Sequence, residues 1–431
     1  MSPKSPVKRL TTPNIVSAVG GLVLALGLSC DAVLDIKPPH VKIVSPADGD
    51  SIRGGTLVRV EADDQSVSRL QLYLDDSLVA TASQSPLEVT PELDTSFSTH
   101  RLRAVAYDRG GNWSEDRTTV VRLVPRVSLT LLSTYDTPGS ALDFAIAGEY
   151  LYVADSSSLI VLSLANPTAP AEVGSFSGGH SYYCDVHVAG SLACVADYTG
   201  KPNLFDVSDP CAPRLLSTLG IHSGASGVYC GESLAYAVSW RDTFYVADIS
   251  NPSVPVILGR CKITANPDLP VAVHIEKPGN YAYVMSSSYG AEVVDVTNPS
   301  TPLRVAGLFH SNESGLGHLA IWHDTVYYAS DACVGVADVA RPTNPVDLGS
   351  FQVRGDVSGL ATDDSLLYVA SARPQSCESL HVLSRADGTE RARALALGTP
   401  MSVAVVDSFL YVACKDAGIK VYQRKQEWVV K

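Results

Sequence analysis

Two aspartates and one histidine stand at equivalent points of a repeated pattern, where they could carry out acid–base or cation chemistry. Asp143, Asp185 and His318 each open a short apolar segment. A carboxylate and an imidazole in one place can exchange protons with a substrate, and carboxylate oxygens also bind cations. The competing interpretation is that these side chains only accept hydrogen bonds at strand ends, and the sequence favours that structural role. Other copies carry small residues at this point: Gly227, Ala272, Gly359 and Ser402.

A second set of equivalent positions carries aromatic residues in loops. Tyr198, Trp240 and Tyr289 occupy the same loop in three successive copies, and Arg241 follows Trp240. Exposed aromatic rings beside an arginine suit a protein-binding hot spot or stacking against a sugar. The alternative is that each ring packs on its own hairpin, and for the cluster the two interpretations carry equal weight.

A repeat with a period in the low forties positions both sets. The gaps between the centres of the second strand in successive copies are 42, 42, 47, 44, 41 and 43 residues. Four short strands at this period are typical of one blade of a β-propeller. We therefore predict an all-β fold with a seven-bladed β-propeller over residues 125–431. The centres are Tyr152, Cys194, Tyr236, Tyr283, Tyr327, Tyr368 and Tyr411.

The last copy of the repeat lacks its outer strand. The segment Ser128–Tyr135 has the pattern of a fourth strand and follows no earlier copy. Pairing it with the three C-terminal strands would close the ring and remove two open sheet edges, which otherwise invite aggregation. We expect this pairing.

The repeat resembles the LVIVD family of bacterial propellers. This resemblance implies an exported or surface propeller, and it brings no catalytic residues that could be transferred to this chain. Two copies depart from the pattern, with Leu164 and Leu383 where the others have aspartate. The segments that carry the resemblance are Asp185–Gly190, Phe205–Pro210, Val246–Pro252 and Val293–Pro299.

Residues 39–124 alternate apolar and polar side chains between turn signals, which predicts an antiparallel β-sandwich. This region resembles the bacterial immunoglobulin-like domains of exported proteins through Ser45–Gly49 and Ala106–Asn112. Hairpin turns are expected at Asp75–Asp76 and Gly110–Asn112, where Gly and Asx residues tolerate positive φ.

A calcium site is conceivable in this first domain. Asp63, Asp64, Asp108 and Asn112 could supply the oxygen ligands that calcium prefers. The alternative, which we favour, is that Asp108 and Asn112 cap the hairpin through side-chain to backbone hydrogen bonds.

The N-terminus has the features of an export signal. Lys4, Lys8 and Arg9 precede the apolar stretch Ile15–Leu28, and Cys30 follows at the expected cleavage site. Residues 1–29 thus resemble a lipoprotein signal peptide with Cys30 as the lipidated residue, and residues 30–38 a linker. The alternative is an ordinary secretory peptide that is cut nearby. Either one places the chain in the bacterial cell envelope, lipid-anchored or periplasmic or extracellular.

The composition of the chain argues against some classes of function. The net charge of −13 argues against a nucleic-acid partner, because phosphate binding requires a basic surface. Eight further cysteines could form disulfides after export, but none has the C-x-x-C spacing of a zinc or redox site.

We expect a binding protein that recognises a protein or glycan with the propeller rim. The alternative is a lyase or hydrolase with a polar, metal-assisted site at the channel mouth.

Overall fold

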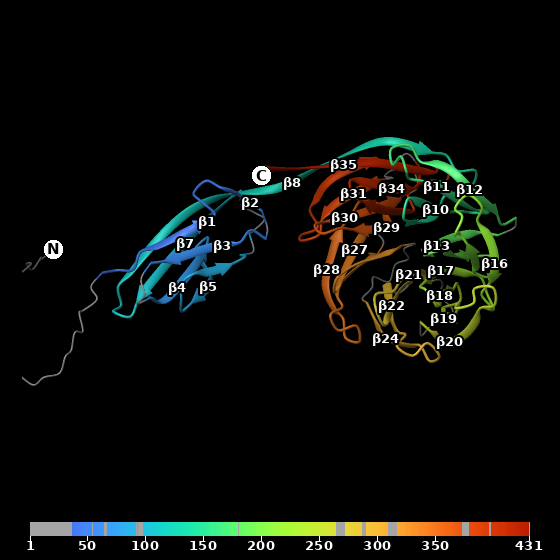
Figure 1. Cartoon of the computed structure of the whole chain (residues 1–431), viewed down its shortest axis with the longest axis horizontal. Helices are drawn as coiled ribbons and strands as arrows, with labels where there is room; N and C mark the ends of the chain where they lie inside the picture. Colours follow the sequence, from blue (N-terminus) through green and yellow to red (C-terminus); the bar gives the residue numbers. More distant parts are fainter. Residues whose placement is uncertain are drawn as a thin grey trace, which may run out of the picture. The chain divides into compact units, whose positions relative to one another are not determined.

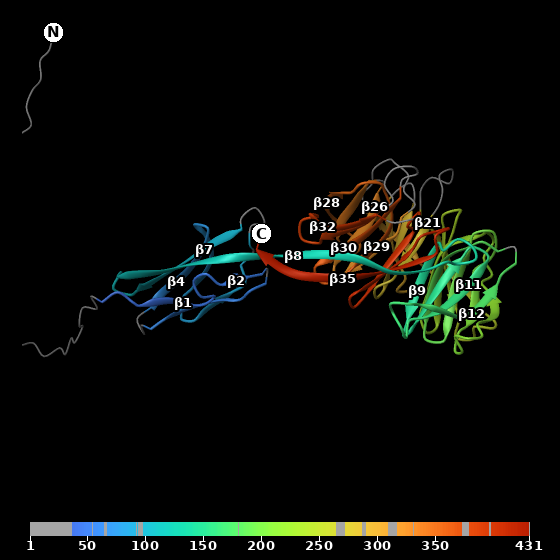
Figure 2. The same ribbon diagram turned by 90° about the horizontal axis from the view of Figure 1, so that it is seen from above.

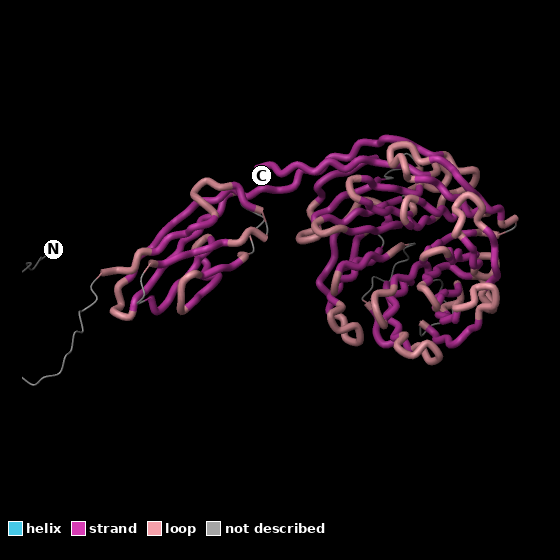
Figure 3. Tube along the Cα trace, in the orientation of Figure 1, coloured by secondary structure: helices cyan, strands magenta, loops and turns pink. Residues whose placement is uncertain are grey.

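The computed structural model describes residues 37–53, 55–63, 67–91, 93, 98–179, 181–263, 272–286, 290–308, 317–330, 332–372, 379–395 and 398–430. The signal segment, Cys30, Asp64 and Tyr289 lie outside these ranges. All regular elements of the described ranges are β-strands, drawn in magenta in Figure 3. No helix among them is long and apolar enough to cross a membrane. The chain divides into a smaller unit that ends at Arg122 and a larger unit, Leu123–Val430.

The smaller unit contains two sheets, which share one apolar core. Buried Val58 and Val60 of the first sheet belong to the same cluster as Leu72, Leu102 and Val120 of the second. The first sheet has the order β1 (Val41–Ser45), β3 (Val58–Ala62), β6 (Leu87–Val89). The second contains β8 (Trp113–Tyr135), β7 (Thr99–Asp108), β4 (Val67–Leu74) and β5 (Ser77–Ala82), and β2 (Ser51–Ile52) pairs with β8.

Both predicted hairpin turns are present in this unit. Asp75 and Asp76 have φ values of 49° and 67°, and Gly111 has a φ of 85°. The carboxylate of Asp108 accepts hydrogen bonds from the backbone N–H and the side-chain amide of Asn112, at 2.8 and 2.7 Å. These hydrogen bonds form the hairpin cap that was expected as the alternative to a calcium site.

The larger unit consists of antiparallel four-stranded sheets that follow one another around a ring (Figure 1). Each predicted second-strand centre lies in the second strand of a sheet. The first three sheets contain β9 (Asp143–Ala147), β10 (Tyr150–Asp155), β11 (Ser158–Ser163) and β12 (Ala171–Ser177); β13 (Tyr183–Ala189), β14 (Leu192–Asp197), β15 (Asn203–Asp206) and β16 (Arg214–Thr218); and β17 (Ala225–Cys230), β18 (Leu234–Ser239), β19 (Thr243–Asp248) and β20 (Val256–Lys262).

The next three sheets repeat this order. They contain β21 (Ala272–Glu276), β22 (Tyr281–Ser286), β23 (Gly290–Asp295) and β24 (Leu303–Gly307); β25 (Leu319–Trp322), β26 (Thr325–Ser330), β27 (Cys333–Asp338) and β28 (Val346–Gln352); and β29 (Asp356–Thr362), β30 (Leu366–Ala372), β31 (Ser379–Ser384) and β32 (Glu390–Leu395). The middle strands are apolar and buried along most of their length, because each sheet packs between two neighbours.

The remaining strands form the expected closing arrangement. β33 (Ser402–Val406), β34 (Phe409–Ala413) and β35 (Ile419–Val430) are followed by β8 as the fourth strand. The pairing runs from Ile419 opposite Tyr135 to Val430 opposite Leu123, and Figure 2 shows the two long strands side by side. The predicted pairing of Ser128–Tyr135 with the C-terminal strands is confirmed.

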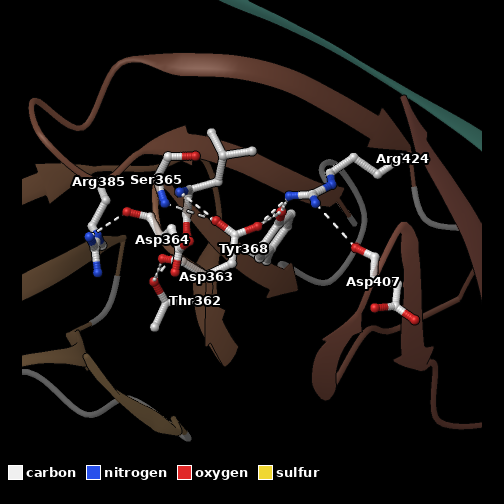
Figure 4. A network of polar contacts seen from close by, with 9 residues as sticks. Thr362, Asp363, Asp364, Ser365, Tyr368, Arg385, Asp407 and Arg424 are labelled. Carbon is white, nitrogen blue, oxygen red and sulfur yellow. Dashed lines mark hydrogen bonds and ion pairs between the residues drawn. The ribbon is translucent and has the colours of Figure 1, made fainter. Parts of the chain in front are cut away.

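A polar network joins the last two sets of strands (Figure 4). Arg424 of β35 donates hydrogen bonds to the carboxylate of Asp363 and the hydroxyl of Tyr368, and at 3.1 Å to the carbonyl of Asp407. Burial raises the pKa of Asp363, but the N–H of Ser365, the Tyr368 hydroxyl and the Arg424 charge outweigh it and hold the pKa below its usual range. The charge of Asp363 is therefore stabilised in the folded state.

Deleting Val127–Tyr135 is expected to unfold the larger unit, because β35 would be left with a row of unpaired backbone groups. Thermal unfolding followed by circular dichroism would measure this. Leu131→Thr is the control: Leu131 is an exposed residue of β8, and this substitution keeps the backbone pairing. A deletion variant with a single cooperative transition at the wild-type midpoint would contradict the role given to β8.

The Asp363 network gives a pH-dependent prediction. Because its folded-state pKa lies below the unfolded value of about 3.9, Asp363 contributes stability that is present above about pH 4 and is lost as pH falls through the folded pKa. Arg424→Leu should lower the free energy of unfolding by about 1–3 kcal/mol at pH 7, and the exposed neighbour Lys425→Leu much less. Urea titrations of both variants at pH 7 and pH 3 test this. Equal losses at both pH values would contradict the charge-based explanation.

Candidate functional site

A cavity of about 500 Å³ lies where the inner strands of the larger unit begin. Pockets of roughly 300–1,000 Å³ enclose small-molecule ligands. The ring brings the starts of the inner strands together, so that one residue at the start of the inner strand in each of six sheets lines the cavity. These residues are Leu142, Cys184, Ser226, His318, Ser358 and Met401.

The two sets of residues that the sequence singled out meet at this cavity. Tyr198 from the aromatic loops and His318 from the inner strands both line it. Tyr182, which sequence analysis missed, also lines it. Asp143 and Asp185 follow the lining residues Leu142 and Cys184 in the sequence and are not among the described lining residues themselves.

The rings of Tyr182, Tyr198 and Trp240, with Arg241, form one aromatic cluster beside the cavity. The ring centroids of Tyr182 and Tyr198 are 6.3 Å apart, and those of Tyr198 and Trp240 are 6.4 Å apart. The guanidinium of Arg241 lies 4.7 Å from the centroid of the Trp240 ring. Tyr182 and Tyr198 are 41% and 42% exposed, so part of each ring is available to a ligand.

Backbone contacts between neighbouring loops hold the aromatic cluster. The N–H of Tyr198 donates to the carbonyl of Tyr182 at 2.9 Å, and that of Trp240 donates to Gly224 at 3.3 Å. Asp197, almost fully buried, accepts the N–H groups of Tyr182 and Thr199, both at 3.0 Å. A Cβ atom on Gly224 would lie 1.9 Å from the Tyr198 carbonyl oxygen, so this close approach requires glycine.

Asp143 and Asp185 are each only 3% exposed and bond to the next inner strand. The Asp143 carboxylate accepts the N–H of Val186 at 3.2 Å, and the Asp185 carboxylate accepts the N–H of Val228 at 2.6 Å. Each aspartate thus makes the structural contact at a strand end that the sequence favoured.

His318 is connected to these carboxylates through a residue that the sequence analysis missed, His274. The two imidazole rings are stacked with centroids 4.4 Å apart. Nδ1 of His274 lies 3.7 Å from Asp185, and Nε2 lies 3.5 Å from Glu276, which are ion-pair distances longer than hydrogen bonds. The strand register makes His274, and not Ala272 as the sequence predicted, the equivalent of Asp143 and Asp185. These three residues lie two positions before the strand partners of Tyr152, Cys194 and Tyr283.

Three of these side chains, Asp143, His274 and His318, have shifted pKa values. Burial raises the pKa of Asp143, and the charge of Asp185 raises it further. Burial lowers the pKa of His274, but Asp185 and Glu276 outweigh it and raise the pKa to about 10. Burial and the charge of His274 lower the pKa of His318 to about 4. These shifts favour the protonated form of His274 and the neutral form of His318, which lines the cavity.

Other groups that could do chemistry are engaged in structure. Ser371, His381 and Glu390 are linked like a catalytic triad, with 3.0 Å between Ser371 Oγ and His381 Nε2 and 2.7 Å between His381 Nδ1 and Glu390. Ser371 is fully buried and its hydroxyl donates to the carbonyl of Arg354, so it is not accessible as a nucleophile. Within the described ranges, no three His, Cys, Asp or Glu side chains form a metal-ligand group.

The seven described cysteines form no disulfide with one another. Cys184 lines the cavity, and burial raises the pKa of its thiol well above the usual value. A protonated thiol is a poor nucleophile, so Cys184 contributes an apolar wall rather than reactivity.

Comparisons with known proteins agree with this architecture. Residues 39–104 match the bacterial Ig domain, and residues 138–177, 180–219, 224–263 and 272–306 match the LVIVD repeat. The chain resembles the Myceliophteria thermophila Cps50 (Swd1) beta-propeller domain, with a TM-score of 0.56, 11% identity, and coverage of 69% of this chain and 99% of that one. The computationally designed Ika8 protein gives a TM-score of 0.52, 11% identity, and coverage of 69% and 100%.

At this level of identity the two structures indicate the fold alone. A search of curated proteins gives no match. The chain is thus a propeller-like repeat protein with an Ig-like domain, and the four LVIVD matches lie on its first four sheets, β9 to β24.

Substituting Gly224 is expected to disturb the aromatic cluster. Gly224→Ala places a methyl group against the Tyr198 carbonyl, so the two loops must separate. Gly220→Ala is the matched control, because a Cβ there meets nothing within 4 Å. Tryptophan fluorescence and the unfolding midpoint measure the effect. If the two variants gave the same emission spectrum and midpoint, the close contact would not be what holds the loops.

Proposed function

We propose that this chain is a binding protein of the bacterial cell envelope that holds a glycan in the cavity beside the aromatic cluster. In this proposal the larger unit is a closed seven-bladed β-propeller and the smaller unit an immunoglobulin-like sandwich. The observation that carries the proposal is that the partly exposed rings of Tyr182 and Tyr198 line an open cavity of about 500 Å³. Aromatic rings that border a concave site with a few polar groups are suited to stacking against sugar rings.

The shape of the site favours a glycan over a protein partner. A protein interface generally buries about 800 Å² per partner on a broad surface, with hot-spot side chains at its centre. Here Tyr182 and Tyr198 line a hollow whose wall also carries the hydroxyls of Thr199, Ser226 and Ser358. Small pockets of this kind take one end of a chain-like ligand. A protein that inserts a loop is the competing outcome of the test below.

Export and anchoring are also part of the proposal. The basic residues, apolar stretch and Cys30 at the N-terminus support a lipid-anchored protein, and the negative charge supports a partner other than nucleic acid. The smaller unit would serve as a spacer between the anchored Cys30 and the propeller. This arrangement suits the capture of glycans in the cell envelope.

Binding is tested with the double variant Tyr198→Ala, Trp240→Ala on an array of bacterial envelope glycans. Loss of the aromatic surface is expected to weaken capture on the order of 30-fold, which corresponds to about 2 kcal/mol. Trp113→Ala is the control, because Trp113 is an exposed tryptophan of the smaller unit, 56% accessible. An unchanged glycan signal in the double variant, or capture of envelope proteins alone, would contradict the proposal.

A hydrolase or lyase is the second candidate, and the stacked His274–His318 pair is the observation that favours it. A neutral imidazole beside a cationic one can exchange protons with a bound sugar. Mass spectrometry of the captured glycan after incubation distinguishes the two functions. A ligand recovered intact from the wild type supports binding alone, whereas cleavage that is lost in Asp185→Asn supports the enzyme.

A further inference from the structure

Building on the proposed glycan function, we infer that the aromatic cluster recognises an acidic sugar, whose carboxylate or phosphate group binds to Arg241 and Lys262. These two exposed cations adjoin the same turn, between β18 and β19 of the third sheet. The neutral part of the glycan would occupy the cavity, and the acidic group would lie outside it beside Trp240.

The guanidinium of Arg241 is available to an anion. Its side chain is exposed and lies over the Trp240 ring, 4.7 Å from the ring centroid. It forms no ion pair or side-chain hydrogen bond with the residues that the structure describes. A guanidinium stacked on a ring keeps the N–H groups at its edge free, and these match two oxygens of a carboxylate or phosphate. Because the ring already restricts the side chain, binding an anion costs less conformational entropy.

Lys262 adds a second positive charge at this turn. It lies opposite Thr243 in the pairing of β19 with β20, and its ammonium donates to the backbone carbonyl of Arg241 at 2.8 Å. An ammonium has three N–H groups, so two remain for a ligand. The hydrogen bond holds this long, exposed side chain against the turn that contains Arg241. The turn therefore presents two cations whose positions are restricted before a ligand binds.

The surface around these cations is basic, although the chain has 45 acidic and 32 basic residues. In the segments Tyr198–Pro202, Ser239–Thr243 and Leu258–Ile263, the only acidic residue is Asp242, which is 2% exposed. An acidic ligand would meet attraction at this part of the rim, because exposed charges act over about 10 Å at moderate salt. The exposed basic residues of these segments are Lys201, Arg241, Arg260 and Lys262.

The aromatic rings connect this basic surface to the cavity. Tyr198 lines the cavity, and its ring centroid is 6.4 Å from that of Trp240, on which Arg241 stacks. A glycan with one sugar in the cavity would place the next sugar on these rings, where its acidic group meets the guanidinium. The rings would contact the apolar face of the sugar and the cations its charge, so an acidic sugar satisfies both. An acidic peptide supplies the charge without the sugar ring and is the competing ligand.

The test uses the full-length chain in detergent on an array of matched oligosaccharides that end in glucose, glucuronate or glucose 6-phosphate, or in galactose or galacturonate. Wild type is expected to bind the acidic members about tenfold more tightly than the neutral ones, as one charge-assisted hydrogen-bonded contact provides. Arg241→Gln should remove most of this preference, whereas Arg241→Lys should keep part of it, because lysine has the charge without the planar fork.

Arg214→Gln is the matched control and should keep the wild-type ratio. Arg214 is an exposed cation of β16 that already pairs with Asp206, at 3.2 Å. Unfolding curves check that each variant folds. Lys262→Gln and a salt series on the wild type are independent measurements: the preference for acidic sugars should fall in both, and binding of neutral sugars should change little with salt.

The outcomes separate this inference from the proposed function. Equal binding of acidic and neutral members by the wild type would overturn the inference and leave glycan binding standing. An absence of binding to every glycan would overturn both. Loss of acidic and neutral binding by the same factor in Arg241→Gln would show that Arg241 supports the rings instead of binding the acidic group. Capture of an aspartate-rich peptide in preference to the acidic sugars would also overturn the inference.

Discussion

The pairing of β35 with β8 is the constraint on which the larger unit depends. It brings the first and last parts of that unit together, with Ile419 opposite Tyr135 and reciprocal hydrogen bonds of 3.0 Å between Ala141 and Lys415. Gly418 has a positive φ of 66°, and a Cβ there would lie 2.1 Å from the Tyr135 carbonyl. Because Leu142 comes from one side of this junction and Met401 from the other, the cavity exists only when the ring is closed.

Inside the ring, polar side chains connect one inner strand to the next at a spacing set by the repeat. Asp143 reaches the N–H of Val186, Asp185 that of Val228, and His187 that of Cys230, each 43 residues further on. These two aspartates and the histidine are residue types found in catalytic sets. Here they satisfy backbone donors that would otherwise be buried without a partner. The fourth and fifth sheets differ from this series, because the rings of their residues His274 and His318 stack on each other.

The sequence contained enough to predict the strands, both hairpin turns and the closing strand, because period, turn residues and alternation are local signals. Tyr182 was missed because its place beside Tyr198 depends on a backbone bond between residues in different loops of one sheet. His274 was missed because the spacing between the third and fourth copies is longer than the others, so that Ala272 was aligned with Asp185, whereas the strand register aligns His274 with it. The meeting of Tyr198 and His318 at one cavity needed three-dimensional distances.

The charges of Asp185 and Glu276 act on the cavity through the two stacked histidines. His274 is held protonated by Asp185 and Glu276, and its charge in turn keeps His318 neutral. His274 is thus paired with two carboxylates, and the described residues that line the cavity contribute apolar side chains, an imidazole, hydroxyls and two tyrosine rings. Both aspartates are held at strand ends by backbone hydrogen bonds, so of these side chains it is His318 that lines the cavity.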